Sequence, residues 1–361
     1  MTLIVVCVFA LFPLSFSRFN TAQTMREQYN LMDAYFAISN RIGDERPYRY
    51  TSNEVIVVDI ANIYDRDELA DVIETVCMAE PRVVGLDVFF EEKKDEEADR
   101  RIRRSAADQR VISPIILSLG MPEDITSFKG AVLPFYMNDI KDNSGFVNVA
   151  SSGASQIVRT FPKSLSLGNV DIPNIDIAIV REVSRPSYLK AIERESDVEY
   201  INYSLSSFTS ISAESLPYNM DLLKDRVVII GDRADVSDMH VTPLGPRTPG
   251  VDIHAMSVAT ILEEKYINVM SEAGAWILAF VTIFLFLPIL RLVKLNSWSS
   301  VFCPVIQTLL ILISIFFYYI VFASHGYYVK VVYALMGIGF LDFAYNLYYK
   351  IKEVCVKLFS H

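Results

Sequence analysis

Strongly apolar residues gather in four blocks of this 361-residue chain, one at the N-terminus and three toward the C-terminus. The first block, Leu3–Phe16, contains no charged side chain. The other three are close to or above the roughly 20 residues that a helix needs to cross a bilayer. The pattern predicts an α-helical membrane bundle of four spans, with a membrane anchor at residues 1–17, transmembrane helices at 273–293, 299–323 and 327–349, and a short cytoplasmic tail at 350–361.

The N-terminal block leaves two interpretations open. Its 14 apolar residues are few for a spanning helix and fit the core of a signal peptide, with Ser15-Phe16-Ser17 as a small-residue cleavage site. No Lys or Arg precedes the block, which favours an uncleaved anchor. A start codon upstream of Met1 would account for its shortness.

Between these blocks, short apolar runs alternate with amphipathic segments. Val55–Ile60 is a β-branched run, Arg66–Ala79 repeats apolar residues with a period of 3.6, and Arg82–Phe90 is apolar again. A charged helical segment at 95–107 and a further apolar run at 110–117 continue the alternation. This order is typical of βαβ units in a parallel sheet. We therefore predict an α/β domain with a mainly parallel sheet and helices.

Two local patterns add detail to this domain. Residues 145–148 and 157–161 flank the turn-forming Ser151-Ser152-Gly153, which predicts an antiparallel hairpin. Residues 91–104 are dense in charges of both signs, which indicates a solvated helix face with ion pairs between neighbouring turns.

Charge is distributed as unevenly as hydrophobicity. Residues 18–272 hold 27 of the 33 basic and 41 of the 43 acidic residues, a formal charge of −14 that argues against a nucleic-acid partner. Positive residues mark cytoplasmic segments, and they follow the first and the last of the C-terminal blocks (Arg291, Lys294, Lys350, Lys352 and Lys357). The acidic domain is therefore expected on the extracytoplasmic side of the cytoplasmic (inner) membrane.

The acidic domain contains a series of short motifs in a fixed order. They are Leu31–Phe36, Val57-Val58-Asp59-Ile60, Val84–Phe89, Gly145–Asn148 followed by Arg159, Ile201-Asn202-Tyr203, Leu223–Gly231, Asp238–Leu244 and Pro249–Ala255. Their order, together with one apolar block before and three after, resembles the type-2 CHASE domain, a family of extracytoplasmic sensory domains associated with cyclases and histidine kinases.

The resemblance implies a CHASE-like sensory domain at residues 25–268. Two features depart from the family. The hairpin before Arg159 reads Ser-Gly-Ala-Ser where members often carry Asp-Gly, and the sequence continues only 12 residues beyond Tyr349, too few for a kinase or cyclase domain. We therefore expect the output reaction to reside in a separate cytoplasmic or membrane partner.

Candidate ligand-binding side chains lie in these motifs and at the expected ends of strands. Asp59 and Asp87 fall at or near the carboxyl ends of two strands expected to be adjacent, where open α/β sheets bind ligands. The full candidate set is Asp59, Asp87, Arg159, Asp238, His240, Thr242 and His254. The alternative is structural: the two aspartates bond loop amides and His254 packs within its helix.

No catalytic, metal or cofactor site is predicted. Asp238, His240 and His254 could form an acid–base or metal set, but their spacing matches no zinc pattern. Neither a phosphate-binding glycine loop nor a nucleophile elbow is recognisable.

Three polar residues interrupt the expected spans: Gln307, Asp342 and Asn346. Asp342 and Asn346 are four apart and share a helix face. Either they make a buried polar contact, within the bundle or with a partner helix, or Asp342 simply reaches interfacial water.

Two functions of different classes remain open. In the first, the chain is a sensory subunit that perceives a small-molecule or envelope signal and passes it through its helices to a partner. In the second, it is a structural subunit of an envelope assembly. An extracytoplasmic hydrolase is the least favoured interpretation, and self-association into a homo-oligomer is compatible with either of the first two.

Overall fold

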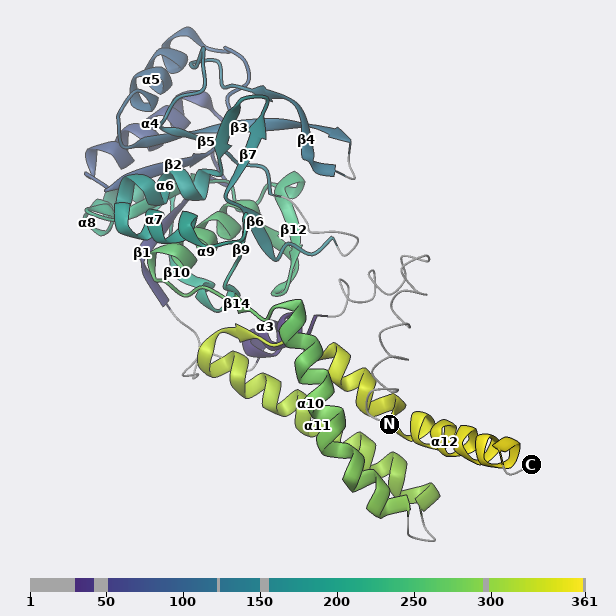
Figure 1. The fold of residues 1–361 in the computed structure, drawn as a ribbon. Coiled ribbons are helices and arrows are strands. Elements are labelled where there is room, and N and C mark those ends of the chain that lie inside the picture. Colours follow the sequence, from purple (N-terminus) through teal and green to yellow (C-terminus); the bar gives the residue numbers. More distant parts are fainter. Residues whose placement is uncertain (1–29, 42–50, 122–123, 150–155, 295–298, 360–361) are drawn as a thin grey trace. The chain divides into compact units, whose positions relative to one another are not determined.

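The computed structural model describes residues 30–41, 51–121, 124–149, 156–294 and 299–359. The chain divides into two compact units, Asp33–Ile267 and a second that includes Asn268–His361 (Figure 1). The expected membrane anchor at 1–17 lies outside the described residues.

The first unit is built on a seven-stranded sheet whose spatial order is β10-β1-β11-β2-β3-β4, with β5 paired to β3. Every pair is parallel except β3–β4, which confirms the predicted α/β domain with a mainly parallel sheet. The strands are β1 (Thr51–Asp59), β2 (Val83–Asp87), β3 (Val111–Met121), β4 (Asp124–Val132), β5 (Ser144–Phe146), β10 (Ser207–Ser212) and β11 (Val227–Gly231).

Antiparallel hairpins are present, but not where the sequence pattern placed one. β5 is fully buried and pairs in parallel with β3, while β6 (Thr160–Pro162) pairs with β9 (Val198–Tyr200). The hairpins are formed by β7 (Ser164–Leu167) with β8 (Val170–Pro173), and by β12 (Met239–Thr242) with β13 (Gly245–Pro249). The expected turn at Ser151-Ser152-Gly153 lies outside the described residues, and the strands before and after it pair with different partners.

Helices cover both faces of the sheet. Alternate strand residues such as Val58 and Leu86 pack on α4 (Arg66–Met78) and α5 (Glu96–Ala106). Gly85 points the other way, where a β-carbon would lie 2.5 Å from Ile179 of α6. The second face carries α6 (Ile175–Val183) and α9 (Gly250–Leu262), and α7 (Arg185–Glu193) packs on these two helices. The remaining helical segments of this unit are α3 (Leu31–Arg41), α8 (Met220–Leu223), η3 (Tyr203–Leu205), η4 (Ala213–Tyr218) and η5 (Val236–Asp238).

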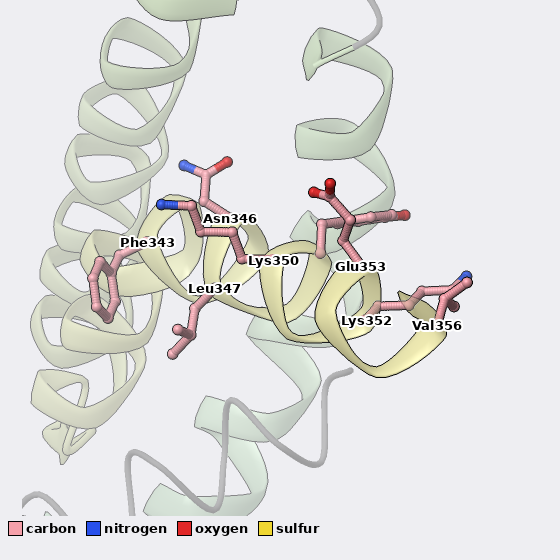
Figure 2. A pocket seen from close by; sticks show the side chains of 8 residues that line it. Phe343, Asn346, Leu347, Lys350, Lys352, Glu353 and Val356 are labelled. Atoms are coloured by element: carbon pink, nitrogen blue, oxygen red, sulfur yellow. The ribbon is translucent and has the colours of Figure 1, made fainter. Parts of the chain in front are cut away.

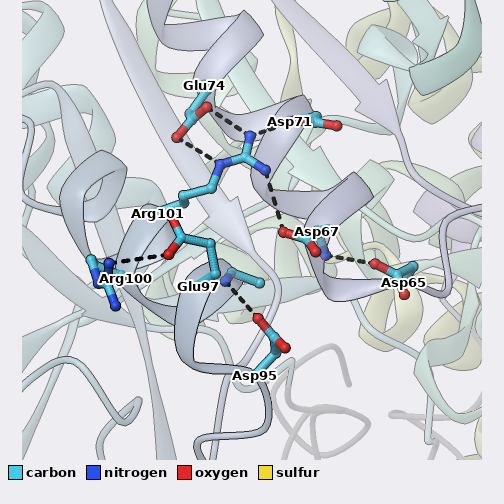
Figure 3. Close-up of polar contacts among 9 residues, drawn as sticks. Asp65, Asp67, Asp71, Glu74, Asp95, Glu97, Arg100 and Arg101 are labelled. Carbon is cyan, nitrogen blue, oxygen red and sulfur yellow. Dashed lines mark hydrogen bonds and ion pairs between the residues drawn. The ribbon is translucent and has the colours of Figure 1, made fainter.

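The charged segment near residue 100 forms ion pairs within α5 and across to α4 (Figure 3). Arg100 pairs with Glu96 and Glu97 on its own helix, at 3.3 and 3.1 Å. Arg101 instead reaches α4, where its guanidinium bonds Glu74 at 2.8 Å and also contacts Asp71. These pairs join the two helices on the side away from the core.

The second unit contains three long helices: α10 (Glu272–Lys294), α11 (Ser299–His325) and α12 (Val332–Phe359). Among the described residues, two helices are long and apolar enough to cross a membrane, Glu272–Lys294 and Phe302–His325. The short strands β14 (Asn268–Val269) and β15 (Tyr327–Tyr328) pair in parallel. α12 begins five residues later than the span expected at 327–349 and remains helical through most of the expected tail.

Candidate functional site

The carboxyl ends of the parallel strands meet at one edge of the sheet, the edge at which open α/β sheets bind ligands. β1 ends at Asp59 and β2 at Asp87, and both residues are register partners of Gly231 at the end of β11. The two aspartates therefore share this edge, as expected, but their strands are not adjacent. β11, which comes much later in the sequence, inserts between them.

His254 is the centre of a buried charged cluster at this edge. Its Nδ1 lies 2.8 Å from Oδ1 of Asp176, and its Nε2 lies 3.3 Å from the carbonyl oxygen of Val147. A carboxylate and a carbonyl can only accept hydrogen bonds, so both ring nitrogens carry protons and the ring is an imidazolium. Burial by itself lowers the pKa of His254, but the negative charges of Asp176 and Asp87 outweigh it and raise the pKa to about 10.

Asp87 faces the same imidazolium without a hydrogen bond to it. Its Oδ1 lies 3.9 Å from Nε2 of His254, and the Asp87 side chain is 12% exposed. No hydrogen-bond donor within the described part of the chain reaches this carboxylate. Burial raises the pKa of Asp87 to about 6; His254 opposes this shift, while Asp238 and Asp176 add to it.

Asp238 and His240 border the cluster from the β12 side. Oδ1 of Asp238 lies 2.9 Å from Nε2 of His240. The Asp238 carboxylate also packs against Gly250, the first residue of α9, where any β-carbon would collide with it. The glycine of the Pro249-Gly250 motif thus permits this carboxylate to approach the beginning of the helix that carries His254.

Local structure at α6 holds the partners of His254. Asn174 caps this helix, its Oδ1 accepting from the backbone N–H of Asp176 at 2.8 Å. Gly145 in β5 lets the helix start approach closely, because a β-carbon there would lie 2.6 Å from Cα of Ile175. Val147, whose carbonyl faces His254, follows β5 directly. The packing of one glycine therefore positions both hydrogen-bond partners of the imidazolium.

A small void of about 10 Å³ adjoins His254. Its polar lining comes from Asn148, Thr160, Asn174, Asp176 and Ser257 in addition to His254. A void of this size holds at most about one water molecule. In this conformation the void admits a water or a proton but no larger ligand.

Asp59 makes contacts of the structural kind. Its Oδ1 accepts from the backbone N–H groups of Ala61 and Arg233, at 3.1 and 3.2 Å. Arg233 in turn forms a two-pronged ion pair with Asp252 of α9, at 2.9 and 2.8 Å. Burial raises the pKa of Asp252 and the Arg233 charge lowers it, with a net upward shift. These three charged residues tie the end of β1 to α9.

Arg159 and Thr242 make their contacts with residues outside the His254 cluster. Arg159 is buried and forms a two-pronged ion pair with Asp33 of α3. The hydroxyl of Thr242 lies 2.7 Å from that of Thr248 on the neighbouring strand. Of the seven candidates, the structure thus brings together Asp87, Asp238, His240 and His254, and it gives the other three separate partners.

The sequence interpretation did not include Asp176, Asp33 or the Arg233–Asp252 pair. A signal for Asp176 was present: it is the one charged residue in the apolar stretch Ile175–Val180, and a lone carboxylate on a buried helix needs a partner. The partner's identity depended on how α6 and α9 pack, which local patterns do not specify.

The polar residues of the second unit also have partners inside the chain. Nζ of Lys294, at the end of α10, lies 2.5 Å from Asp342 and 3.0 Å from Oδ1 of Asn346. Asn346 donates to Asp342 at 3.3 Å, so both lie on one face of α12. Gln307 of α11 donates to the carbonyl of Ile338, one turn before Asp342. Each of the three polar side chains therefore makes a contact within this unit.

An open groove of about 870 Å³ runs along the last turns of α12. Figure 2 shows its described lining residues projecting from this one helix, among them Phe343, Asn346, Lys350 and Glu353. The groove is therefore a helix flank rather than a cavity built by several described elements.

The fold and the cluster define a class: an α/β domain, with a buried charged group at the edge where its parallel strands end, joined to apolar helices long enough to span a membrane. The CHASE2 domain model matches residues 3–289, and the chain belongs to this family of extracytoplasmic sensory domains. The match extends beyond the expected 25–268 into the first apolar block and α10. No curated protein and no solved structure matches the chain.

Proposed function

We propose that this protein is a membrane-bound sensory subunit. Its extracytoplasmic domain perceives a signal, and its membrane helices pass the resulting change to a separate membrane or cytoplasmic partner. Membership of the CHASE2 family supports the sensory role. Transmission to a partner is the further step that requires an experiment.

The position of His254 carries the proposal. This buried cation sits on α9, within a cluster of carboxylates at the ligand-binding edge of the sheet. α9 ends at Leu262, and α10 begins at Glu272, ten positions later in the chain. A change in the cluster that displaces α9 has only this short connection to cross before it reaches an apolar helix.

The proposed location is the inner membrane, crossed four times, with the α/β domain outside and the C-terminal end of α12 inside. The support is the placement of Arg291, Lys294, Lys350, Lys352 and Lys357. A reporter enzyme active only in the periplasm should be silent when fused after Tyr349 and active when inserted at Gly168, an exposed turn. Activity of the Tyr349 fusion would contradict this orientation.

We propose that the chain has no catalytic activity of its own. The cluster is engaged in internal contacts, and the void beside His254 is too small for a substrate. A turnover activity of the purified chain that disappears in Asp87→Ala, while the melting temperature is kept, would overturn this part.

Transmission can be followed at Cys355, an exposed cysteine near the end of α12. In the full chain, with Cys7, Cys77 and Cys303 replaced by Ser, a fluorine-NMR label on Cys355 reports on that helix. Samples in lipid nanodiscs are exposed to sets of amino acids, sugars and divalent cations, and to a change of pH. A label at Phe316→Cys on the exposed side of α11 serves as the control.

We expect at least one condition that raises the melting temperature to change the Cys355 spectrum and not the control spectrum. Conditions that raise the melting temperature without any change at Cys355 would contradict transmission. They would favour a structural envelope subunit.

A further inference from the structure

The imidazolium of His254 has two carboxylates near it and only one is needed to balance its charge. Asp176, 1% exposed, takes the Nδ1 hydrogen bond at 2.8 Å. The Nε2 hydrogen is directed to the carbonyl of Val147. Asp87 is left 3.9 Å away, facing a cation that is already neutralised.

The groups that face Asp87 come from four other elements and are two carboxylates and two imidazoles. They are Asp176 on α6, His254 on α9, Asp238 on η5 and His240 on β12. An ionised Asp87 would add a further negative charge beside an imidazolium that Asp176 already neutralises, and close to the carboxylate of Asp238. Like charges and poor solvation both favour a neutral carboxyl at such a position.

We propose that Asp87 is a proton-binding site and that acidity of the extracytoplasmic space is a signal this domain perceives. The inference rests on the proposed sensory function, and it names the ligand of that same edge of the sheet. Burial raises the pKa of Asp87 to about 6, so the side chain changes charge within the range over which an extracytoplasmic space can acidify.

A metal cation is the other ligand that a group of carboxylates suggests. No set of three or more His, Cys, Asp or Glu side chains in the described residues is arranged to hold one. Asp176 and His254 are also hydrogen-bonded to each other and do not both face a common point at which a cation could bind. A proton requires only one carboxyl group, and Asp87 supplies it.

The charge change at Asp87 is placed where it can move α9. Asp87 is the register partner of Gly231, where a β-carbon would lie 2.7 Å from Val251 of α9. Asp238, which interacts electrostatically with Asp87, packs on Gly250. When Asp87 ionises, its repulsion of Asp238 acts at the first turn of α9. The first turn of α9 is therefore held in place when Asp87 is protonated and is loosened when Asp87 is ionised.

Hydrogen–deuterium exchange of the full chain in nanodiscs tests this at about pH 5 and about pH 6.5, below the interval in which His254 contributes its own pH dependence, with rates corrected for the chemical exchange of free peptide. We expect peptides covering 231–242 and 250–256 to be protected at the lower pH and to exchange faster at the higher pH. The shift of the Asp87 pKa from 3.8 to about 6 limits the change in the opening equilibrium to the order of 100-fold.

Variants separate Asp87 from its neighbours. Asp87→Asn, a neutral isostere, should stay in the protected state at both pH values. Asp87→Glu, which keeps a carboxyl group, should retain a pH response. Asp59→Asn, at the end of β1 beyond the intervening strand β11, and His240→Gln, which removes the other imidazole near Asp87, should both keep the response. A full response in Asp87→Asn, or its loss in His240→Gln, overturns the inference.

The two sets of experiments distinguish failure of the proton site from failure of the proposed sensory function. If the α9 peptides respond through Asp87 but the Cys355 label does not, proton binding stands and transmission fails. If the Cys355 label responds to another compound while the α9 peptides ignore pH, transmission stands and the proton site is refuted.

Discussion

The guanidinium of Arg159 forms a two-pronged ion pair with the carboxylate of Asp33, which lies 126 positions earlier in the chain, with N–O distances of 2.9 and 2.6 Å. Arg159 is 4% exposed, so the pair is largely removed from water. Beside it, Phe36 of the same helix packs edge-on against Tyr203, whose hydroxyl donates to the carbonyl of Val158 at 2.7 Å. α3 is thereby fastened to the α/β domain by one buried ion pair and one aromatic contact.

Removing the arginine should loosen α3 and destabilise the domain. Breaking a buried ion pair costs about 3–5 kcal/mol, because the remaining charge stays buried without a partner. For Arg159→Ala we expect a melting temperature lower by on the order of 10 °C and rapid proteolysis near α3. The double variant Arg159→Met/Asp33→Leu, which removes both charges, should recover much of the loss. Equal damage in the single and double variants would show that the charges themselves are not the cause.

His254 predicts a specific dependence of stability on pH. Its pKa is raised from 6.5 in the unfolded chain to about 10 in the folded one, so its stabilising contribution is complete below pH 6.5 and is lost as the pH rises toward 10. Between about pH 6.5 and about pH 8.5 the free energy of unfolding should fall by at most about 1.4 kcal/mol per pH unit.

The measurement is the melting temperature of the full chain across this interval. His254→Gln should be less stable at pH 6.5 and should show a flatter profile, and Asp176→Asn should flatten it as well because it removes the main charge that holds the proton on the ring. The thiol of Cys77, with a pKa raised to about 11 by burial, acts above this window. An unchanged slope in His254→Gln would assign the pH dependence to other groups.

Sequence reasoning was sufficient for the features that depend on local pattern. The alternation of apolar runs and amphipathic segments identified β1, β2 and β3 with α4 and α5, and the two apolar helices α10 and α11 followed from length and composition. The positions of Asp59 and Asp87 at or near strand ends were also correct, because each is a charged residue in the last part of an apolar run.

Sequence reasoning failed for the features that depend on packing between segments far apart in the chain. β11 is over 130 positions from β2 in the chain and yet separates β1 from β2, so no local signal could show that Asp59 and Asp87 flank a third strand. Residues 145–148 were predicted to form a hairpin with residues 157–161 because a Ser-Gly stretch separates them, whereas β5 pairs in parallel with β3. Asp176, the main partner of His254, depends on the packing of α6 against α9 and was missed for the same reason.

Gly145 is expected to tolerate no side chain. A β-carbon there would lie 2.6 Å from Cα and 2.8 Å from the backbone N of Ile175, atoms that cannot move without shifting α6. Gly145→Ala should destabilise the domain by roughly 1–3 kcal/mol and lower the pKa of His254, because Asp176 and Val147 move with these segments. Gly130→Ala, where no atom lies within 4 Å of the added carbon, is the matched control. Similar melting temperatures and His254 titrations in both variants would refute the assignment.

Asp342 should hold α10 and α12 together. Its carboxylate lies 2.5 Å from Nζ of Lys294 and accepts from Asn346, and the side chains of Lys294 and Asp342 are only 18% and 33% exposed. We predict that Asp342→Leu inserts normally but weakens assembly, with itself or with a partner, since the Lys294 ammonium then turns away from α12.

Co-purification in mild detergent measures the assembly of Asp342→Leu against that of Leu335→Ala. Lys294→Gln should reproduce the loss, and Lys294→Asp/Asp342→Lys should restore it. Equal recovery in Asp342→Leu and Leu335→Ala would mean that the carboxylate only reaches interfacial water and that the α10–α12 contact rests on packing such as that of Gly337 against Ile283.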